Sequence, residues 1–350
     1  MENYWEIYGN FWSKNKFPYD VAKELARTNC SFYGVSKMKK NLGLPYMGSK
    51  SKIAEKLLSE IIKRNPEAEI FIDLFAGGCS MSHSALINGA FKKVYANDLN
   101  KAPQLFKDVI DGKYRDNKRW ISRDEFFKLR DTDEFVKSVW TFGNNGNSYL
   151  YGQYIEPFKK AYHYARLLND FSLFNEFSPY IEKEFNGNLR KYIKTNQERI
   201  KQDYIEWYLS RNSDNLDKLK NISGLERLQH LERFQRLQEL ETLKDLSEML
   251  EISQGSYQDF KLPEPSKCVI YCDIPYKGTQ GYKHDGEKLE FDYEAFYDWV
   301  REKSNQGYSI FISEYECPDD FKEVLSIDLN CSFSSFGVKK TKERLYTYKN

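Results

Sequence analysis

The sequence predicts an α/β protein whose parallel sheet is divided by an inserted, mostly helical segment. Short runs rich in β-branched and aromatic residues alternate with helical apolar patterns over residues 53–110 and again over 251–350. Parallel strands require such crossovers. The intervening residues 111–250 show no such alternation and are rich in aromatic, asparagine and basic residues. We therefore expect an insertion there.

Composition places the chain among globular proteins. Its 350 residues are 40% hydrophobic and 30% charged, enough for one large or two modest domains. No apolar run approaches the roughly 18 residues that span a bilayer, and the first residues lack a signal-peptide stretch. We expect a cytoplasmic protein without a membrane segment. The six cysteines are scattered with no histidine near the closest pair, so packing thiols and no metal are expected.

The net charge indicates no particular partner, but the distribution of charged residues along the chain is informative. The net charge is +1, but residues 37–52, 190–201 and 339–349 are basic and interleaved with aromatic residues. A face that binds nucleic acid needs such local concentration rather than a high overall charge. For any one stretch, solvated surface is the simpler interpretation.

The first elements can be placed in order. Residues 1–43 form an extension with apolar residues at helical spacing, compatible with a small helix-turn-helix, although a plain pair of packing helices is favoured. An amphipathic helix starts at Ile53 and is closed by Asn65-Pro66. EIFIDLF then predicts a strand, AGGCSMSHSALINGA a glycine turn entering a helix, and KVYANDLN a second strand. Together they make a β-α-β unit.

The end of the insertion carries an unusual repeat, in which an apolar residue recurs at every third position from Leu225 to Ile252. On an α-helix each step of three falls back by about 60°, so this stripe would wind around the helix. Broken helices or a stack with three residues per turn are expected, acting as a structural spacer.

The sheet pattern then resumes. MLEISQGSYQDF and VIYCD predict two strands, FDYEAFYDWVREKSNQG a helix and YSIFISEY another strand, and a C-terminal pair follows around residues 331–350.

Distinctive residues stand where these strands end, which is where open α/β sheets bind ligands. Glycines there let a ligand approach the backbone, and an acid there can accept hydrogen bonds from ribose hydroxyls. A single acid at a strand tip is more commonly a helix cap, and the glycine pair departs from the dinucleotide spacing. The combined set predicts a pocket for an adenosine-bearing cofactor; it comprises Asp73, Phe75, Gly77 and Gly78 after the first strand, Asp98 after the second, Asp259 after the third and Asp273 after the fourth.

These stretches, in this order, resemble the motifs of the Dam-type (D12 class) adenine-N6 DNA methyltransferases. The resemblance rests on PYMGSKSKIAEKL, FIDLFAGGCS, VYANDLN, Asp259 and YCDIPY, and FGNNGNSYLYGQYIEPFKKAYHY is similar to the recognition region of the family. It implies a Rossmann-like S-adenosylmethionine-dependent methyltransferase sheet over 44–110 and 251–350. Residues 111–250 would be the target-recognition insertion, double-stranded DNA the partner, and the protein a monomer.

The resemblance also implies roles for individual residues. The catalytic set would be Asp273, Ile274, Pro275 and Tyr276, and the cofactor-binding set Tyr46, Lys50, Asp73, Phe75, Gly77, Gly78, Asp98 and Asp259. ISEY and ERLY, at 312–315 and 343–346, resemble later strands that shape the target pocket. Candidates for phosphate contact are Arg115, Arg119, Lys159, Lys160 and Arg190.

The chemistry of the Asp-Ile-Pro-Tyr turn follows from its residue types. An exocyclic adenine amine is a poor nucleophile because its lone pair is conjugated with the ring. The carboxylate of Asp273 and the carbonyl of Ile274 would hold its two hydrogens and stabilise the developing positive charge. Pro275 would stiffen the turn, and Tyr276 would stack on the extruded base, worth roughly 1–3 kcal/mol against an extrusion cost of a few kcal/mol.

Two residues depart from the family pattern, because Ile274 replaces a proline and Cys79 replaces a common glycine. A catalytically weakened DNA-binding homologue therefore stays an alternative. So does a methyltransferase for another planar amine, such as cytosine N4, RNA adenine or a protein glutamine amide.

Overall fold

A computed structural model describes residues 42–46, 48–143, 146–212, 219–220, 222–277, 283–284, 287–288, 290–331 and 339–349. These residues form two compact units, the first made from 42–44, Gly48–Asp111 and Thr242–Asn350 and the second from 45–46 and Gly112–Glu241. The helices expected in the N-terminal extension lie outside the described residues.

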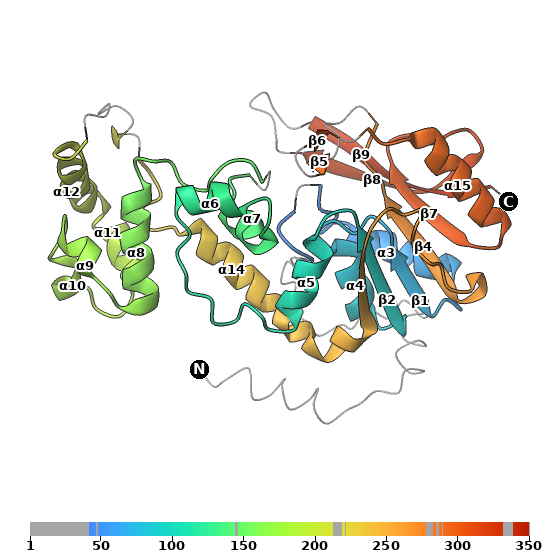
Figure 1. Cartoon of the computed structure of the whole chain (residues 1–350), viewed down its shortest axis with the longest axis horizontal. Coiled ribbons are helices and arrows are strands. Elements are labelled where there is room, and N and C mark those ends of the chain that lie inside the picture. The colour runs from blue at the N-terminus through green and yellow to red at the C-terminus, as the bar shows by residue number, and fades with distance from the viewer. Residues whose placement is uncertain are drawn as a thin grey trace. The chain divides into compact units, whose positions relative to one another are not determined.

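The first unit is built on a seven-stranded sheet in the order β3-β2-β1-β4-β7-β9-β8 (Figure 1). The first five strands in this order are mutually parallel, and β9 is antiparallel to both of its neighbours. The fold is thus the predicted Rossmann-like α/β class. The strands are β1 Ile70–Asp73, β2 Lys93–Asp98, β3 Leu250–Gln254, β4 Cys268–Asp273, β7 Ser309–Glu314, β8 Phe321–Cys331 and β9 Lys339–Tyr348.

Helices cover both faces of this sheet. The helices of the unit are α3 Ala54–Arg64, α4 Ser80–Asn88, α5 Ala102–Ile110 and α15 Tyr293–Asn305. The connections β1-α4-β2 and β4-α15-β7 run in opposite directions along the sheet, so their right-handed crossovers place α4 and α15 on opposite faces. As predicted, α3 stops at Asn65, whose backbone N–H bonds to the carbonyls of Ile61 and Ile62.

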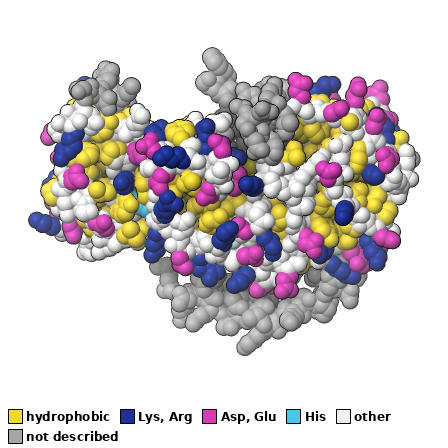
Figure 2. Space-filling view, in the orientation of Figure 1, with side chains coloured by type: hydrophobic (Ala, Val, Ile, Leu, Met, Phe, Trp, Pro, Cys, Tyr) yellow, Lys and Arg dark blue, Asp and Glu magenta, His cyan; other side chains and the backbone are white. Residues whose placement is uncertain are grey.

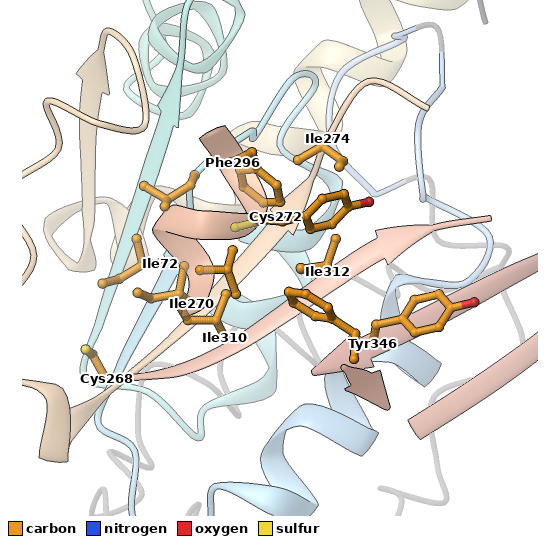
Figure 3. Close-up of a cluster of buried hydrophobic side chains, with 13 residues drawn as sticks. Ile72, Cys268, Ile270, Cys272, Ile274, Phe296, Ile310, Ile312 and Tyr346 are labelled. Carbon is orange, nitrogen blue, oxygen red and sulfur yellow. The ribbon is translucent and has the colours of Figure 1, made fainter. Parts of the chain in front are cut away.

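One core lies between the sheet and α15 (Figure 3). Its strand residues follow a period of two, because alternate side chains of a strand point to the same face. They are Ile72 and Leu74 from the β1 segment, Cys268, Ile270, Cys272 and Ile274 from the β4 segment, and Ile310 and Ile312 from β7. The residues between them, Asp73 and Asp273 among them, therefore face the other side.

The strand order reverses between β1 and β4, which makes their carboxyl ends the switch point where ligands bind in such sheets. The two strands are direct neighbours, with Asp73 opposite Tyr271. The tips of the first and fourth strands thus lie side by side.

The second unit is mainly helical. Short helices dominate it, and an antiparallel bridge joins Thr141 to Tyr149 around residues 142–148. The helices are α6 Arg123–Leu129, α7 Glu134–Trp140, α8 Glu156–Leu168, α9 Ser172–Asn175, α10 Ile181–Glu184, α11 Leu189–Thr195, α12 Gln197–Leu209 and α14 Gln229–Leu240.

The leucine repeat adopts two conformations in succession. Helix α14 carries its middle part, a 3₁₀ helix, Glu241–Met249, carries Leu243, Leu246 and Met249, and Ile252 lies in β3. A 3₁₀ helix has three residues per turn, so a three-residue period stays on one edge of it. Leu237, Leu240 and Leu243 are all buried. Within the 3₁₀ helix itself Leu243 is buried, whereas Leu246 and Met249 are half-buried.

Two expected boundaries were wrong. Strand β3 ends at Gln254, so Asp259 does not stand at its tip; it lies five residues later in an exposed turn, where its N–H bonds to the Ser256 carbonyl. The ring of Phe260 packs on Tyr95 of β2 with centroids 5.7 Å apart. The first strand of the C-terminal pair begins at Phe321, ten residues before the expected position.

Figure 2 shows lysine and arginine side chains interspersed with aspartate and glutamate on the visible face. Such mixing matches the small net charge of +1. No helix among the described residues is long and apolar enough to cross a membrane.

Candidate active site

The glycine turn after β1 is fastened to the end of β2. The N–H of Gly77 donates to Asp98 Oδ2 at 2.8 Å, and the N–H of Ala76 donates to the Asn97 carbonyl at 2.9 Å. Gly77 has φ +46°, in the left-handed region that favours glycine. The turn thereby leads directly into α4, whose first N–H groups lie at the switch point.

Residues 42–44 pack against this turn. The N–H of Leu44 donates to the Gly78 carbonyl at 2.7 Å, and the hydroxyl of Ser80 donates to the Leu42 carbonyl at 3.1 Å. A Cβ on Gly43 would lie 2.3 Å from the Gly78 oxygen, so only glycine allows this approach. Residues 42–44, just before Tyr46, are therefore anchored to the glycine turn after β1.

Asp73 holds the start of α4. Its Oδ2 accepts hydrogen bonds from the Ser82 N–H at 3.1 Å and the Ser82 hydroxyl at 2.7 Å, and the residue is 1% exposed. Burial raises the pKa of Asp73 to about 7, and the hydrogen bonds from Ser82 oppose the shift. This carboxylate is thus engaged within the protein.

The Asp98 carboxylate accepts hydrogen bonds from the protein and keeps one position at which it could accept another. Besides Gly77, it accepts from the Asn100 N–H at 2.9 Å and the Asn100 side-chain amide at 3.2 Å. A carboxylate offers about four acceptor positions, so these three bonds leave one. Burial raises the pKa of Asp98. Its position beside the glycine turn fits a cofactor that carries ribose hydroxyls.

Asp273, at the end of β4, is paired with Lys50. The Lys50 Nζ lies 2.7 Å from Oδ1 and 2.8 Å from Oδ2, with side chains only 10% and 20% exposed. Lys50 sits just before α3, and its carbonyl accepts from the N–H groups of Ile53 and Ala54. Burial raises the pKa of Asp273, and Lys50 opposes that shift. For Lys50, burial is outweighed by the neighbouring carboxylates, which raise its pKa.

Tyr276 and Glu343 complete this cluster. The Tyr276 hydroxyl donates to Glu343 Oε1, and the Lys50 Nζ lies 4.7 Å above the Tyr276 ring. The Tyr315 ring meets Tyr276 edge to face with centroids 4.6 Å apart. Glu343 Oε1 is also 3.7 Å from the Lys50 Nζ. An ammonium therefore lies between two carboxylates and an aromatic face.

Two further bonds hold the Asp-Ile-Pro-Tyr turn. The Tyr293 hydroxyl donates to the Pro275 carbonyl at 2.9 Å, and the Lys277 N–H donates to Glu314 Oε2 at 3.2 Å. Glu314 is 1% exposed and also accepts from the Tyr315 N–H at 2.6 Å. The backbone on either side of Tyr276 is thereby restrained.

A comparison of the sequence with models of known protein families finds one match. The model of the D12 class N6 adenine-specific DNA methyltransferases matches residues 46–327, which include the glycine turn, Asp98 and the Asp-Ile-Pro-Tyr turn. The chain belongs to the D12 class of N6 adenine-specific DNA methyltransferases. A search of curated proteins finds no match. The activity of the family is N6 methylation of adenine in DNA, and it implies S-adenosylmethionine as the donor.

In this D12 methyltransferase, the departure at Ile274 has a structural reason. Its side chain is 2% exposed and continues the period of two that runs through Cys268, Ile270 and Cys272 into the core (Figure 3). Isoleucine thus anchors the turn by burial, where proline would stiffen it through its ring.

The departure at Cys79 also occupies a demanding position. Cys79 has φ +59° and ψ +34°, a left-handed conformation that costs a residue with a Cβ roughly 1–2 kcal/mol. This explains why glycine is common there in the family. Its thiol is fully buried, and its N–H still donates to the Ala76 carbonyl at 2.6 Å, so the turn keeps its shape.

The other expected cofactor residues are dispersed. Phe75 is half-buried and packs against Tyr257 with centroids 5.5 Å apart, whereas Asp259 is exposed in its turn. Tyr46 belongs to the second unit and so is not placed with the others. Among the described residues, no group of three or more His, Cys, Asp or Glu side chains could hold a metal ion.

One candidate for phosphate contact was wrong. Lys159 is 3% exposed, and its ammonium donates at 2.7 Å to the carbonyls of Gly224 and Arg227. Burial lowers the pKa of Lys159 to about 8. Of the other candidates, Arg115, Arg119 and Arg190 are exposed and paired with glutamates, and Lys160 is exposed.

Sequence reasoning missed the roles of Glu314 and Glu343. Glu314 ends the largely apolar strand β7, whereas Glu343 stands among the lysines and arginine of β9, and both are nearly fully buried. A glutamate in the apolar strand β7 is a recognisable signal for Glu314, but the mixed charges of β9 give none for Glu343, whose partners Tyr276 and Lys50 come from segments far away in the chain.

Proposed function

We propose that the first unit transfers a methyl group from S-adenosylmethionine to N6 of an adenine swung out of duplex DNA, with Asp273 as the central catalytic residue. The observation that carries this proposal is the position of Asp273. Its carboxylate lies at the carboxyl end of β4, beside the tip of β1 and paired with Lys50. This is the switch point at which the sheet would bring donor and acceptor together.

The residues at the tips of β1 and β2 fit the cofactor. Asp98, held by Gly77, has acceptor capacity for ribose hydroxyls, and Phe75 offers an apolar ring. Gly77 and Gly78 would let the cofactor approach the backbone, while Asp73 would act indirectly by holding α4. Asp259 would accept from the adenine amino group, and Tyr46 and Lys50 would support the donor. When bound, S-adenosylmethionine supplies an electrophilic methyl group on a sulfonium.

Asp273 and Ile274 would activate the amine. The Asp273 carboxylate and the Ile274 carbonyl accept the two N6 hydrogens and so orient the lone pair toward the methyl group. Both acceptors are preorganised, because Ile274 is buried in the core and the turn is bonded at Pro275. They stabilise the positive charge that grows on N6. Tyr276 would stack on the extruded base.

The second unit would read the DNA sequence. A cavity of about 410 Å³ in this unit is lined by Arg123 and by aromatic residues that include Phe127, Phe142 and Tyr149. Phe127 is 45% exposed and Phe142 is 62% exposed. Exposed rings and an arginine suit contacts with bases. Arg115, Arg119, Lys160 and Arg190 would contact phosphates. The active species would be a cytoplasmic monomer, which size-exclusion chromatography of the free enzyme can check.

Transfer of tritium from labelled S-adenosylmethionine to unmethylated genomic DNA tests the proposal. The parent should label DNA, whereas Asp273→Ala and Asp273→Asn should lower the rate by at least about 100-fold. Asp298→Ala removes an exposed carboxylate of α15 and should match the parent. Equal labelling by Asp273→Ala and the parent would overturn the catalytic assignment. A parent that binds DNA without labelling it would favour the weakened homologue. Single-molecule sequencing of the product identifies the modified atom and its flanking bases.

A further inference from the structure

Asp273 faces a conflict in the described arrangement. Both of its oxygens lie within 2.8 Å of the Lys50 ammonium. An adenine amine that becomes positive during transfer would share this carboxylate with a group that is already positive. Repulsion between the two would cancel part of the stabilisation that Asp273 provides. Lys50 therefore needs a second anionic partner when the base enters.

Glu343 stands where that partner is needed. Asp273 is opposite Ser313 on β7, and Ser313 is opposite Leu345 on β9. Glu343 is two residues from Leu345, so it points to the same face of the sheet as Asp273. Its Oε1 is 3.7 Å from the Lys50 Nζ, so a shift of about 1 Å would bring the ammonium into hydrogen-bond range.

Glu343 also fixes the aromatic part of the site. Its Oε1 accepts the hydroxyl hydrogen of Tyr276, whose ring lies under the same ammonium. Moving Lys50 toward Glu343 would therefore change what covers the Tyr276 ring while the ring itself stays anchored. Glu343 is only 5% exposed, and burying a carboxylate costs free energy unless a partner compensates its charge. Burial raises its pKa, and Lys50 opposes the shift.

We infer that Glu343 is a positioning residue for methyl transfer: it takes up the Lys50 ammonium as the target amine engages Asp273, and it holds the Tyr276 ring for stacking. This inference rests on the proposed role of Asp273. Glu343 touches neither the base nor the donor and acts through Lys50 and Tyr276.

Single-turnover labelling of genomic DNA with saturating tritiated S-adenosylmethionine tests the inference. Glu343→Gln keeps an acceptor for Tyr276 but removes the charge that attracts Lys50. Its transfer rate should fall about 10- to 100-fold, while its affinity for S-adenosylmethionine should change by less than about 2-fold. Glu323→Gln is the matched control, because it removes the charge of an exposed glutamate of β8 that pairs with Arg344 of β9, and it should leave the rate unchanged.

A double-mutant cycle separates this role from a merely structural one. Once Lys50→Gln has removed the ammonium, adding Glu343→Gln should lower the rate by less than about 3-fold. A Glu343→Gln rate equal to that of the parent, or an undiminished effect in the Lys50→Gln background, would overturn the inference. Should Glu343→Gln fail to fold, Glu343→Asp can replace it, because aspartate keeps the charge but has a shorter side chain. A Glu343→Asp rate equal to that of the parent would likewise overturn the inference. A parent that labels no DNA would overturn the proposed function itself.

Discussion

At the scale of single residues, the pleat of β4 decides the character of the Asp-Ile-Pro-Tyr turn. Asp273 and Ile274 are adjacent, so their side chains point to opposite faces. Asp273 meets Lys50, and Ile274 packs among Cys272, Phe296 and Ile312. One strand end therefore supplies a carboxylate paired with Lys50 on one face and an apolar anchor on the other.

Truncation of that anchor should destabilise the first unit. Ile274→Ala should lower the free energy of unfolding by about 2–4 kcal/mol, because it leaves a cavity in a packed core, whereas Ile274→Val should cost only about 1 kcal/mol. Urea unfolding followed by circular dichroism measures both. If Ile274→Ala cost less than about 1 kcal/mol, burial of this side chain would not be what holds the turn.

At the scale of elements, a buried histidine pair joins α8 to α14 in the second unit. His163 Nδ1 lies 2.8 Å from His230 Nε2, His163 Nε2 lies 2.9 Å from the Lys118 carbonyl, and the Tyr151 hydroxyl lies 2.7 Å from His230 Nδ1. The carbonyl can only accept, so His163 carries its proton on Nε2 and accepts at Nδ1. His230 must then donate from Nε2 and accept from Tyr151. With both rings protonated, the N–H groups at His163 Nδ1 and His230 Nε2 would face each other, and the hydrogen bond between the rings would be lost.

Acid should therefore destabilise the second unit. Burial lowers the pKa of His163 and, together with the charge of its neighbours, lowers that of His230 further. The folded state then binds fewer protons than the unfolded state, so stability is full above the ordinary histidine pKa of about 6.5 and is lost as pH falls below it. Between pH 7.5 and 5.5 each ring can contribute at most about 1.4 kcal/mol to this loss, and the more strongly shifted His230 should contribute the larger part.

Tryptophan fluorescence can follow this transition, because Trp140 stacks on His230 with centroids 4.3 Å apart and Trp120 meets both rings. Urea midpoints at the two pH values give the difference in stability. The His163→Gln/His230→Gln double variant should show a shallower pH dependence. An unchanged slope in that variant would show that other groups dominate.

At the scale of the whole molecule, the site exists because distant segments converge on one sheet. Lys50 precedes β1, Asp273 ends β4, and Glu343 belongs to β9, which follows β7 and β8 in the chain. The second unit is inserted between β2 and β3 without disturbing the strand order. Anything that binds the folded sheet at its switch point therefore stabilises the arrangement as a whole.

Cofactor binding should raise the melting temperature of the parent. Free S-adenosylmethionine at 100 times its dissociation constant contributes about 2.7 kcal/mol, which corresponds to several degrees for a protein of this size. Asp98→Asn should lose most of this rise, because an amide accepts ribose hydroxyls less strongly. Glu251→Gln, which alters an exposed residue of β3, should keep it. Differential scanning fluorimetry measures these melting temperatures. If S-adenosylmethionine raised the melting temperature of Asp98→Asn as much as that of the parent, Asp98 would not belong to the cofactor site.

From the sequence alone one could read the strands, the helices around them, the insertion and the motif residues at the strand tips. Period and composition are local properties, and β1, β2 and α3 fall where they were expected. The end of β3 was misplaced because β3 stops where its partner strand β2 stops, at the pair Asp98 and Gln254, and this pairing is not a local property of the sequence.

Only the tertiary structure decided which charges meet. The strand pattern identified Asp273, and the resemblance to the family motifs identified Lys50 and the ERLY strand, but the pairing of Lys50 with Asp273 and the contacts of Glu343 depend on strand order and register. The burial of Ile274 likewise depends on what covers that face of the sheet. The physical reason is that contacts between residues hundreds of positions apart are set by packing, which no local run of side chains encodes.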